Sequence, residues 1–311
     1  MPLWCESGKI LRLAALLAVA AVLFGACGSA VRPGATTAMP SSTAAAGSES
    51  SAASIAPPRT LTAPATPATA ATAKPAPVAV WRPRVGDTLQ VQYSGTISLS
   101  VDATIYDLDV DDTPASTVAA LHARGRHVFC YIDAGAWENY RADASRFPAA
   151  VLGKAMDGWP DERWLDIRKM SLLAPLLRHR LDTCAAKGFD GVDPDNINGY
   201  TNATGFPLKA ADQLSFNRWL AEEAHSRHLV VALKNDGEQA TALATTFDAA
   251  VVEECVEYSE CALYGAFIKA GKPVFDIEYT RAPSAFCPVA VKLRFAIIGK
   301  HLALDAYRTH C

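Results

Sequence analysis

The sequence predicts an α/β protein: a (β/α)8 TIM barrel, preceded by a signal peptide and a disordered tether. From residue 81 onward, eight short apolar segments alternate with Ala- and Leu-rich segments of helical length, as expected for a barrel of parallel strands. Polar and mostly acidic residues follow nearly every apolar segment, and in a barrel such strand ends converge on one mouth. An open doubly wound sheet would also alternate, but the phosphate motifs GxGxxG and GxxxxGK[ST] do not occur in the sequence.

Residues 1–27 are typical of a lipoprotein signal peptide. Lys9 and Arg12 precede an apolar stretch, 13–24, and small residues lead to Cys27. We expect cleavage before Cys27 and a lipid on its thiol, with plain secretion as the alternative and a transmembrane anchor as the weaker third option. The first two predict export, as a cell-surface or periplasmic lipoprotein or as a secreted protein.

Residues 28–80 consist almost entirely of Ala, Thr, Ser, Pro and Gly, which predicts a disordered linker because such a composition buries little apolar surface. The folded domain is then expected at 81–311. The net charge is −3 and no Lys/Arg run occurs beyond the extreme N-terminus, so we expect no nucleic-acid partner. Membrane association is expected only through the lipid anchor, and the domain is expected to be a monomer.

Six cysteines remain once Cys5 and Cys27 are set aside, and an even number in an exported domain favours disulfides. They are Cys130, Cys184, Cys255, Cys261, Cys287 and Cys311. Fifteen pairings are open; one joins Cys255 to Cys261, Cys287 to Cys311 and Cys130 to Cys184. No CxxC or HxxxH spacing occurs, so no metal site is expected.

The expected elements follow in order along the chain. The strands are predicted at 89–93, 105–108, 127–131, 189–192, 229–233, 247–252, 273–277 and 293–298. The helices are predicted at 113–124, 171–187, 210–227, 238–246, 261–270, 284–292 and 301–308. Thr113 is expected to cap the first helix, with Pro114 at its first position. A long loop, 134–168, carries several aromatic residues.

The predicted strand ends supply the candidate site. They carry Gln92, Asp107, Asp109, Asp133, Asp193, Asp195, Lys234, Asn235, Glu253 and Glu278. The densest stretch is 188–200, GFDGVDPDNINGY. Such carboxylates suit glycoside cleavage, which needs one carboxyl group as acid and another as nucleophile or base. Trp137 and Trp164 would offer flat faces to sugar rings or would pack in the core. Lys234 would hold a carboxylate, contact a hydroxyl or, in an aldolase, form a Schiff base.

Several longer motifs carry a resemblance to a known family. They are YDLD at 106–109, CYIDAGAWE at 130–138, GWPDERWLDIR at 158–168, GFDGVDPDNINGYTNATGFPL at 188–208, LKND at 233–236, VVEECVEY at 251–258 and IEY at 277–279. From about residue 81 to the C-terminus the sequence resembles glycoside hydrolase family 114, the endo-α-1,4-polygalactosaminidase-like barrels. The resemblance implies endo-hydrolysis of α-1,4-linked galactosamine polymers with retention of configuration and without a metal or cofactor.

The resemblance also assigns residues. Asp195, in a motif like V[DE]PDN, is implied as nucleophile, and Glu253, in a motif like VNEQC, as general acid/base; negative charge from Asp193 and Glu254 would help Glu253 hold its proton. The implied substrate-binding residues are Tyr106, Asp107, Asp109, Asp133, Trp137, Trp164, Asp193, Asn196, Lys234, Asn235, Glu278 and Tyr279.

The sequence departs from the family pattern beside both catalytic positions. Val252 and Glu254 stand where Asn and Gln are common, Asp133 where Ser is common and Asp193 where Glu is common. The expected partner is a galactosamine-rich polysaccharide, since an acidic cleft attracts a cationic polymer. The alternative is a surface-displayed barrel that binds carbohydrate without catalysis.

Overall fold

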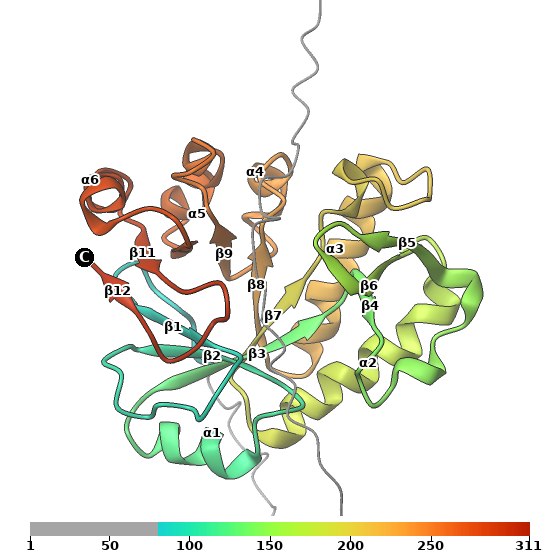
Figure 1. The fold of residues 1–311 in the computed structure, drawn as a ribbon, viewed down its shortest axis with the longest axis horizontal. Coiled ribbons are helices and arrows are strands. Elements are labelled where there is room, and N and C mark those ends of the chain that lie inside the picture. Colours follow the sequence, from blue (N-terminus) through green and yellow to red (C-terminus); the bar gives the residue numbers. More distant parts are fainter. Residues whose placement is uncertain (1–79) are drawn as a thin grey trace, which may run out of the picture. The chain divides into compact units, whose positions relative to one another are not determined.

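Eight parallel strands form a curled sheet at the centre of residues 80–311, the part of the chain that the computed structural model describes (Figure 1). They are β1 (Leu89–Gln92), β2 (Ile105–Asp109), β3 (His127–Asp133), β7 (Gly191–Asp195), β8 (Val230–Lys234), β9 (Ala249–Glu253), β10 (Val274–Glu278) and β11 (Ala296–Gly299). Neighbours in this order pair in parallel. All eight predicted strands are present, within a few residues of their expected ends.

Helices lie around the outside of this sheet (Figure 1). They are α1 (Ala115–His122), α2 (Met170–Lys187), α3 (Ala210–Ser226), α4 (Ala240–Leu243), α5 (Gly265–Lys269) and α6 (Pro283–Leu293). Short 3-10 turns supplement them: η3 (Gly199–Thr201) follows β7 and η4 (Cys261–Tyr264) precedes α5. From β2 to β11 strands and helices alternate as in a (β/α)8 barrel, the predicted fold, although no helix separates β1 from β2 and none follows β11 within residues 80–311. The expected cap at Thr113 is wrong, because α1 starts at Ala115 with Pro114 at the N-cap position.

The helix predicted at 301–308 is wrong. The chain instead turns and returns as β12 (Thr309–His310), antiparallel to β11. The amides of Tyr93 and Ser94 donate to the Leu304 carbonyl at 2.9 and 3.2 Å, and Arg308 Nε donates to the Leu89 carbonyl at 2.8 Å. Within residues 80–311, β1 and β11 do not pair with each other, and we call the gap between these two strands the seam. The C-terminal tail, residues 300–311, supplies hydrogen-bond partners to backbone groups that would otherwise be unpaired at the seam.

Lys300 stabilises the same seam. Its ammonium, almost fully buried, donates to the carbonyls of Asp305 (2.7 Å) and Tyr307. Burial lowers the pKa of Lys300 to about 8.

The predicted structureless loop at 134–168 is also wrong. It forms a small antiparallel sheet in the order β4 (Ala136–Glu138), β6 (Trp159–Leu165) and β5 (Leu152–Met156), with two 3-10 turns, η1 (Ala144–Arg146) and η2 (Ala149–Val151). We call residues 134–168 the insert. The insert follows β3 directly, so it begins at the mouth of the barrel.

Strand alternation divides the core into two layers. One face of each strand contributes to the barrel interior, for example Val91, Phe129 and Ile277. The other face packs against the helices, for example Leu108, Val192 and Leu233. Both faces are buried, as is usual for parallel sheets covered by helices.

Three disulfides connect the six cysteines in the arrangement considered from the sequence: Cys130–Cys184, Cys255–Cys261 and Cys287–Cys311. The last anchors the C-terminal residue to α6, and therefore holds the returning tail in the seam.

The predicted signal peptide, the lipidation site Cys27 and the linker up to residue 79 lie outside the described residues. Within residues 80–311, no helix combines the length and apolar character needed to cross a membrane.

Candidate active site

Side chains at the C-terminal ends of the strands point into the barrel mouth because they continue the inward-facing alternation. Asp107 lies two residues after Ile105, Lys234 two after Ala232, and Glu253 two after Val251; all three earlier residues belong to the interior layer. By the same alternation, Tyr93, Asp193 and Tyr279 face inward. The mouth therefore collects ionisable groups from strands that are distant in sequence.

Lys234 lies at the centre of this group. Its Nζ is 3.3 Å from Asp193 Oδ2, 3.5 Å from Asp195 Oδ1 and 3.8 Å from Glu253 Oε2. Burial opposes the charged ammonium, but the three carboxylates outweigh it and raise the pKa of Lys234 well above its usual value. A permanently charged amine is unsuited to Schiff-base chemistry, which requires the neutral form.

The two proposed catalytic carboxyls are the ones that open to solvent. The side chain of Asp195 is 21% exposed and that of Glu253 is 29% exposed, whereas Asp193 is completely enclosed. Because both lie close to Lys234 Nζ, the oxygens Asp195 Oδ1 and Glu253 Oε2 are separated by at most the sum of their distances to it, about 7.3 Å.

Tyrosine hydroxyls orient both carboxyls. Tyr131 donates to Asp195 Oδ2 at 3.0 Å, and Tyr279 donates to Glu253 Oε1. Burial and the neighbouring carboxylates raise the pKa of each tyrosine well above 10, so each keeps its proton and remains a donor. Asn235 adds a second donor, from Nδ2 to Glu253 Oε2 at 3.3 Å.

Left-handed backbone turns end three of the strands abruptly. Asn196, Asn235 and Glu254 follow β7, β8 and β9 with φ of 60°, 51° and 57°. Asn adopts this conformation more readily than most residues, whereas Glu254 does so at a cost. The turn at Asn196 also brings its carbonyl against Gly135, where a Cβ would approach that oxygen to 1.8 Å. Gly135 is therefore required by the contact between the loops after β3 and β7.

Two predicted site residues, Asp133 and Asn196, support Asp195. Asp133 accepts from the Ala136 amide at 2.6 Å and from Asn196 Nδ2 at 2.8 Å, while the Asn196 amide donates to Asp195 Oδ1 at 2.8 Å. Asp133 is enclosed, and burial together with the charges of Glu138 and Asp195 raises its pKa well above the usual value.

Asp109 lies beside the insert and pairs with Arg141. Arg141 contacts Asp109 Oδ2 at 2.7 Å and Glu138 Oε2 at 2.6 Å. Glu138 also accepts from the Tyr140 hydroxyl at 2.6 Å. The carboxyls of Asp109 and Glu138 therefore already have fixed partners within the protein.

Four residues predicted to bind substrate pack in the core or have partners within the protein. Tyr106 is enclosed in the outer core layer and donates to the Val101 carbonyl. Glu278 is enclosed on the outer face of β10 and accepts from the Val256 amide at 2.7 Å. Trp164 is buried, and Trp137 packs against the core and donates to the Ala144 carbonyl.

Three groups that lie at the mouth were not predicted from the sequence as site residues. The hydroxyl of Tyr93 lies beside Asp107, and Tyr131 contacts Asp195. Both tyrosines end predicted strands, so alternation from Val91 and Phe129 would have placed them inward. The third, Glu162, comes from the insert: it is the cross-strand partner of Glu138, and burial with the charges of Glu138 and Asp195 raises the pKa of Glu162 to about 7.

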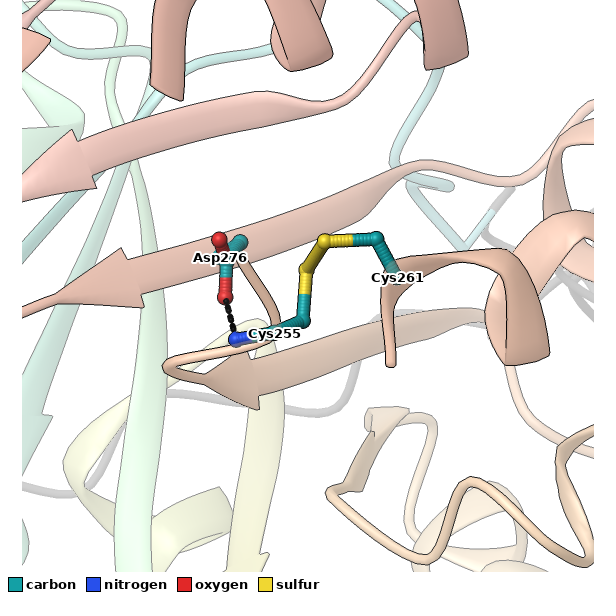
Figure 2. A group of neighbouring side chains, drawn as sticks. All are labelled: Cys255, Cys261 and Asp276. Atoms are coloured by element: carbon teal, nitrogen blue, oxygen red, sulfur yellow. Dashed lines mark hydrogen bonds between the residues drawn. A yellow bond between two sulfur atoms is a disulfide. The ribbon is translucent and has the colours of Figure 1, made fainter. Parts of the chain in front are cut away.

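Asp276 lies beside the Cys255–Cys261 pair (Figure 2). The sulfur atoms are joined as a disulfide, so they do not offer two thiolates to a metal ion. Asp276 Oδ1 accepts from the Cys255 amide at 3.1 Å. Asp276 and Glu278 thus hold the start of the loop that follows Glu253.

Residues 70–311 match the sequence profile of glycoside hydrolase family GH114. The chain belongs to this family, as its motifs predicted, and it is a glycoside hydrolase. A crystal structure of Ega3 from Aspergillus fumigatus in complex with galactosamine is similar over 76% of this chain and 100% of that one, with 37% identity and a TM-score of 0.71.

Two other proteins extend the comparison. The glycoside hydrolase domain of PelA from Pseudomonas aeruginosa shares the fold, with a TM-score of 0.57 and 16% identity over 71% of this chain and 97% of that one. An uncharacterized protein from Deinococcus radiodurans is 29% identical over 215 residues, which is 61% of this chain and 68% of its relative.

Proposed function

We propose that the protein cleaves internal α-1,4 linkages in galactosamine-containing polysaccharide, with Asp195 as nucleophile and Glu253 as general acid/base. The observation that supports this most strongly is the arrangement around Lys234. Of the three carboxyls that Lys234 Nζ approaches, Asp195 and Glu253 are open to a ligand, while Asp193 is enclosed.

The roles follow from the surroundings of each carboxyl. Asp195 accepts from Tyr131 and from the Asn196 amide, and it lies 3.5 Å from Lys234 Nζ. These contacts fix the orientation of the Asp195 carboxyl, which a nucleophile needs. In a retaining enzyme the carboxyls are about 5–5.5 Å apart and in an inverting enzyme about 6.5–9.5 Å. The upper limit of about 7.3 Å set by Lys234 allows the retaining separation, and we propose retention.

Glu253 would exchange its proton with the glycosidic oxygen. Its Oε1 accepts from Tyr279 and its Oε2 faces Asn235 and Lys234. After the first step, Glu253 would accept a proton from the attacking water.

The substrate is proposed to be cationic because one carboxyl near Asp195 lacks a partner. Within residues 80–311, no hydrogen-bond donor or cation contacts the Glu162 carboxyl, unlike those of Glu138 and Asp109. A protonated amino group on the sugar would supply the missing charge. The galactosamine bound to Ega3 in its crystal structure supports the same class of ligand.

The test is release of reducing ends from de-N-acetylated galactosamine polymer by residues 78–311, the compact unit of the chain. We expect Asp195→Asn and Glu253→Gln to lower kcat by about 10³-fold or more, since each removes a group that acts in the reaction. Asp157→Asn, an exposed carboxyl on the insert, is the control and should match wild type. Equal rates for wild type and Asp195→Asn would refute the assignment.

The alternative, a carbohydrate-binding barrel without catalysis, has one observation in its favour. Tyr279, Asn235 and Lys234 all donate toward Glu253 or carry positive charge, so both oxygens of Glu253 already have partners within the protein. Tight binding of the polymer with no product after long incubation would establish this alternative.

We also propose that the protein is exported and anchored through a lipid on Cys27. The three disulfides support export, because such bonds persist in oxidising compartments. Incorporation of a labelled fatty acid into the full chain, lost in Cys27→Ser, is the expected result. Secretion of unlabelled wild-type protein would favour plain secretion instead.

A further inference from the structure

Two carboxyl groups touch each other beneath the proposed catalytic pair. Asp107 on β2 and Asp193 on β7 are both fully enclosed, and their side chains are within hydrogen-bond reach. β3 lies between their strands and pairs with each. No water-exposed surface of either side chain remains to solvate a charge.

Two ionised carboxylates in this position would lack sufficient compensation. Lys234 Nζ reaches Asp193 Oδ2 at 3.3 Å, and within residues 80–311 no cation forms an ion pair with Asp107. The Tyr93 hydroxyl lies beside Asp107, but it is not in hydrogen-bonding geometry. If neither carboxyl carries a proton, both oxygens of Asp107 and Oδ1 of Asp193 are therefore buried without a well-placed donor. Each unmatched acceptor would carry the desolvation penalty of a buried polar group, which is larger still for a charged group.

We propose that Asp107 and Asp193 share one proton, held on Asp107 and donated to Asp193, and that this makes Asp107 a positioning residue for the catalytic carboxyls. The proton supplies the donor that the enclosed oxygens lack. It resides on Asp107 because the Lys234 ammonium, adjacent to Asp193, favours the ionised form of Asp193.

Electrostatics agree with this placement. Burial, followed by the charge of Asp193, raises the pKa of Asp107 well above its usual value. Burial also raises the pKa of Asp193, but Lys234 opposes that rise. The titration belongs to the pair. The surrounding ionisable groups are Tyr93 directly after β1, Tyr131 on β3, Asp195 on β7, Lys234 on β8, Glu253 on β9 and Tyr279 directly after β10.

The shared proton affects Asp195 and Glu253 through Lys234, and this part rests on the proposed function. With the proton present, the pair carries one negative charge, which the Lys234 ammonium balances. Loss of the proton would add a second negative charge below the mouth. It would draw the Lys234 ammonium toward the pair and away from Asp195 and Glu253, so that both catalytic carboxyls would lose the cation that they share.

Infrared spectroscopy tests the proton without requiring activity. At pH 7, the difference spectrum of wild type minus Asp107→Asn should show the carbonyl band of a protonated, buried carboxylic acid. Asp193→Asn should lose the same band, because its amide can donate to an ionised Asp107. Asp276→Asn is the matched control: it removes a different buried carboxyl and should leave the band of the pair. If neither Asp107→Asn nor Asp193→Asn loses a protonated-acid band, the proposal is overturned.

Kinetics test the positioning role separately. In Asp107→Asn the new side-chain amide would donate to Asp193 as the protonated acid does, so its loss of kcat should be smaller than that of Asp193→Asn. In Asp193→Asn the charge that balances Lys234 is lost, and we expect kcat to fall by at least about tenfold with KM changed less. Equal loss in the two variants would show that Asp107 acts as a charged group, which contradicts the shared proton. If wild type cleaves no galactosamine polymer, the proposed function fails while the infrared result stands.

Discussion

The barrel contains two pairs of enclosed carboxyls on opposite faces of its sheet. Asp107 and Asp193 face inward beneath the mouth, and their compensation is the single ammonium of Lys234. Asp276 and Glu278 face outward on β10, and each accepts from a backbone amide, those of Cys255 and Val256. The inner pair therefore connects to the proposed catalytic groups through charge, whereas the outer pair fixes the backbone that follows Glu253.

The inner pair thus supports the site through its charge, and the outer pair supports it by fixing the backbone. An ammonium shared by three carboxylates alters the protonation of every group it touches. A carboxyl bound to backbone amides mainly fixes the position of the loop, and the adjacent Cys255–Cys261 disulfide does the same (Figure 2). We therefore expect changes around the inner pair to affect catalysis and changes around the outer pair to affect stability.

The largest effect is expected for Lys234→Met. Asp193 would be left without its cation and Asp195 would lose a charge at 3.5 Å, so kcat should fall by about 10²–10³-fold, the range seen when one preorganised donor is removed. Lys300→Met is the matched control, because Lys300 is equally buried but binds carbonyls in the seam. It should lower the melting temperature and leave kcat within about threefold. A Lys234→Met variant with wild-type kcat would contradict the role of the inner cation.

A smaller effect, on stability, is expected for the outer pair. Burial, and next the charge of Glu278, raises the pKa of Asp276 to about 8, whereas an unfolded Asp titrates near pH 3.9. The folded protein therefore keeps a proton that the unfolded chain releases, and this group's contribution to stability declines as pH rises from about 4 to about 8. The decline is about 1.4 kcal/mol per pH unit.

Urea unfolding at pH 5.5 and 7.5 measures this decline. Asp276→Asn should flatten the pH dependence of the unfolding free energy, while the exposed control Asp157→Asn should keep the wild-type slope. An unchanged slope in Asp276→Asn would show that the outer pair holds no extra proton.

The smallest effect is expected for Glu162→Gln, a change on the insert beside the mouth. Removing one unpaired carboxylate from the approach to Asp195 should raise KM for de-N-acetylated polymer about 3–10-fold and leave kcat nearly unchanged. Since the pKa of Glu162 is about 7, its charge and hence the difference from the variant should grow as pH rises through 7. Glu222→Gln, an exposed change on α3, is the control. An unchanged KM would show that Glu162 takes no part in substrate recognition.

The sequence predicted the barrel because strand–helix alternation and acidic strand ends are local signals. It did not predict which face of a strand each residue takes, since both faces of a covered parallel strand are apolar. Tyr106 and Glu278 were therefore assigned to the mouth although they face outward, while Tyr93 and Tyr131 were not selected although they face inward.

The other wrong predictions concern segments whose conformation depends on contacts with distant parts of the chain. Residues 301–308 have helical composition, but the tail supplies partners for the open seam beside β1. The insert at 134–168 forms strands whose pairing is not visible as alternation, because Glu138 and Glu162 place two acids opposite each other. The contact between Asp107 and Asp193 joins residues 86 positions apart, and no local pattern indicates it.

Chemical rescue tests the central assignment most directly. With an activated aryl α-glycoside of a galactosamine oligomer and azide, Asp195→Ala should yield the β-glycosyl azide, because azide attacks in place of the missing nucleophile. Under the same conditions Glu253→Ala should yield the α-glycosyl azide, since azide then intercepts the glycosyl-enzyme on Asp195. Formation of the α-azide by Asp195→Ala would contradict the assignment of Asp195 as the nucleophile.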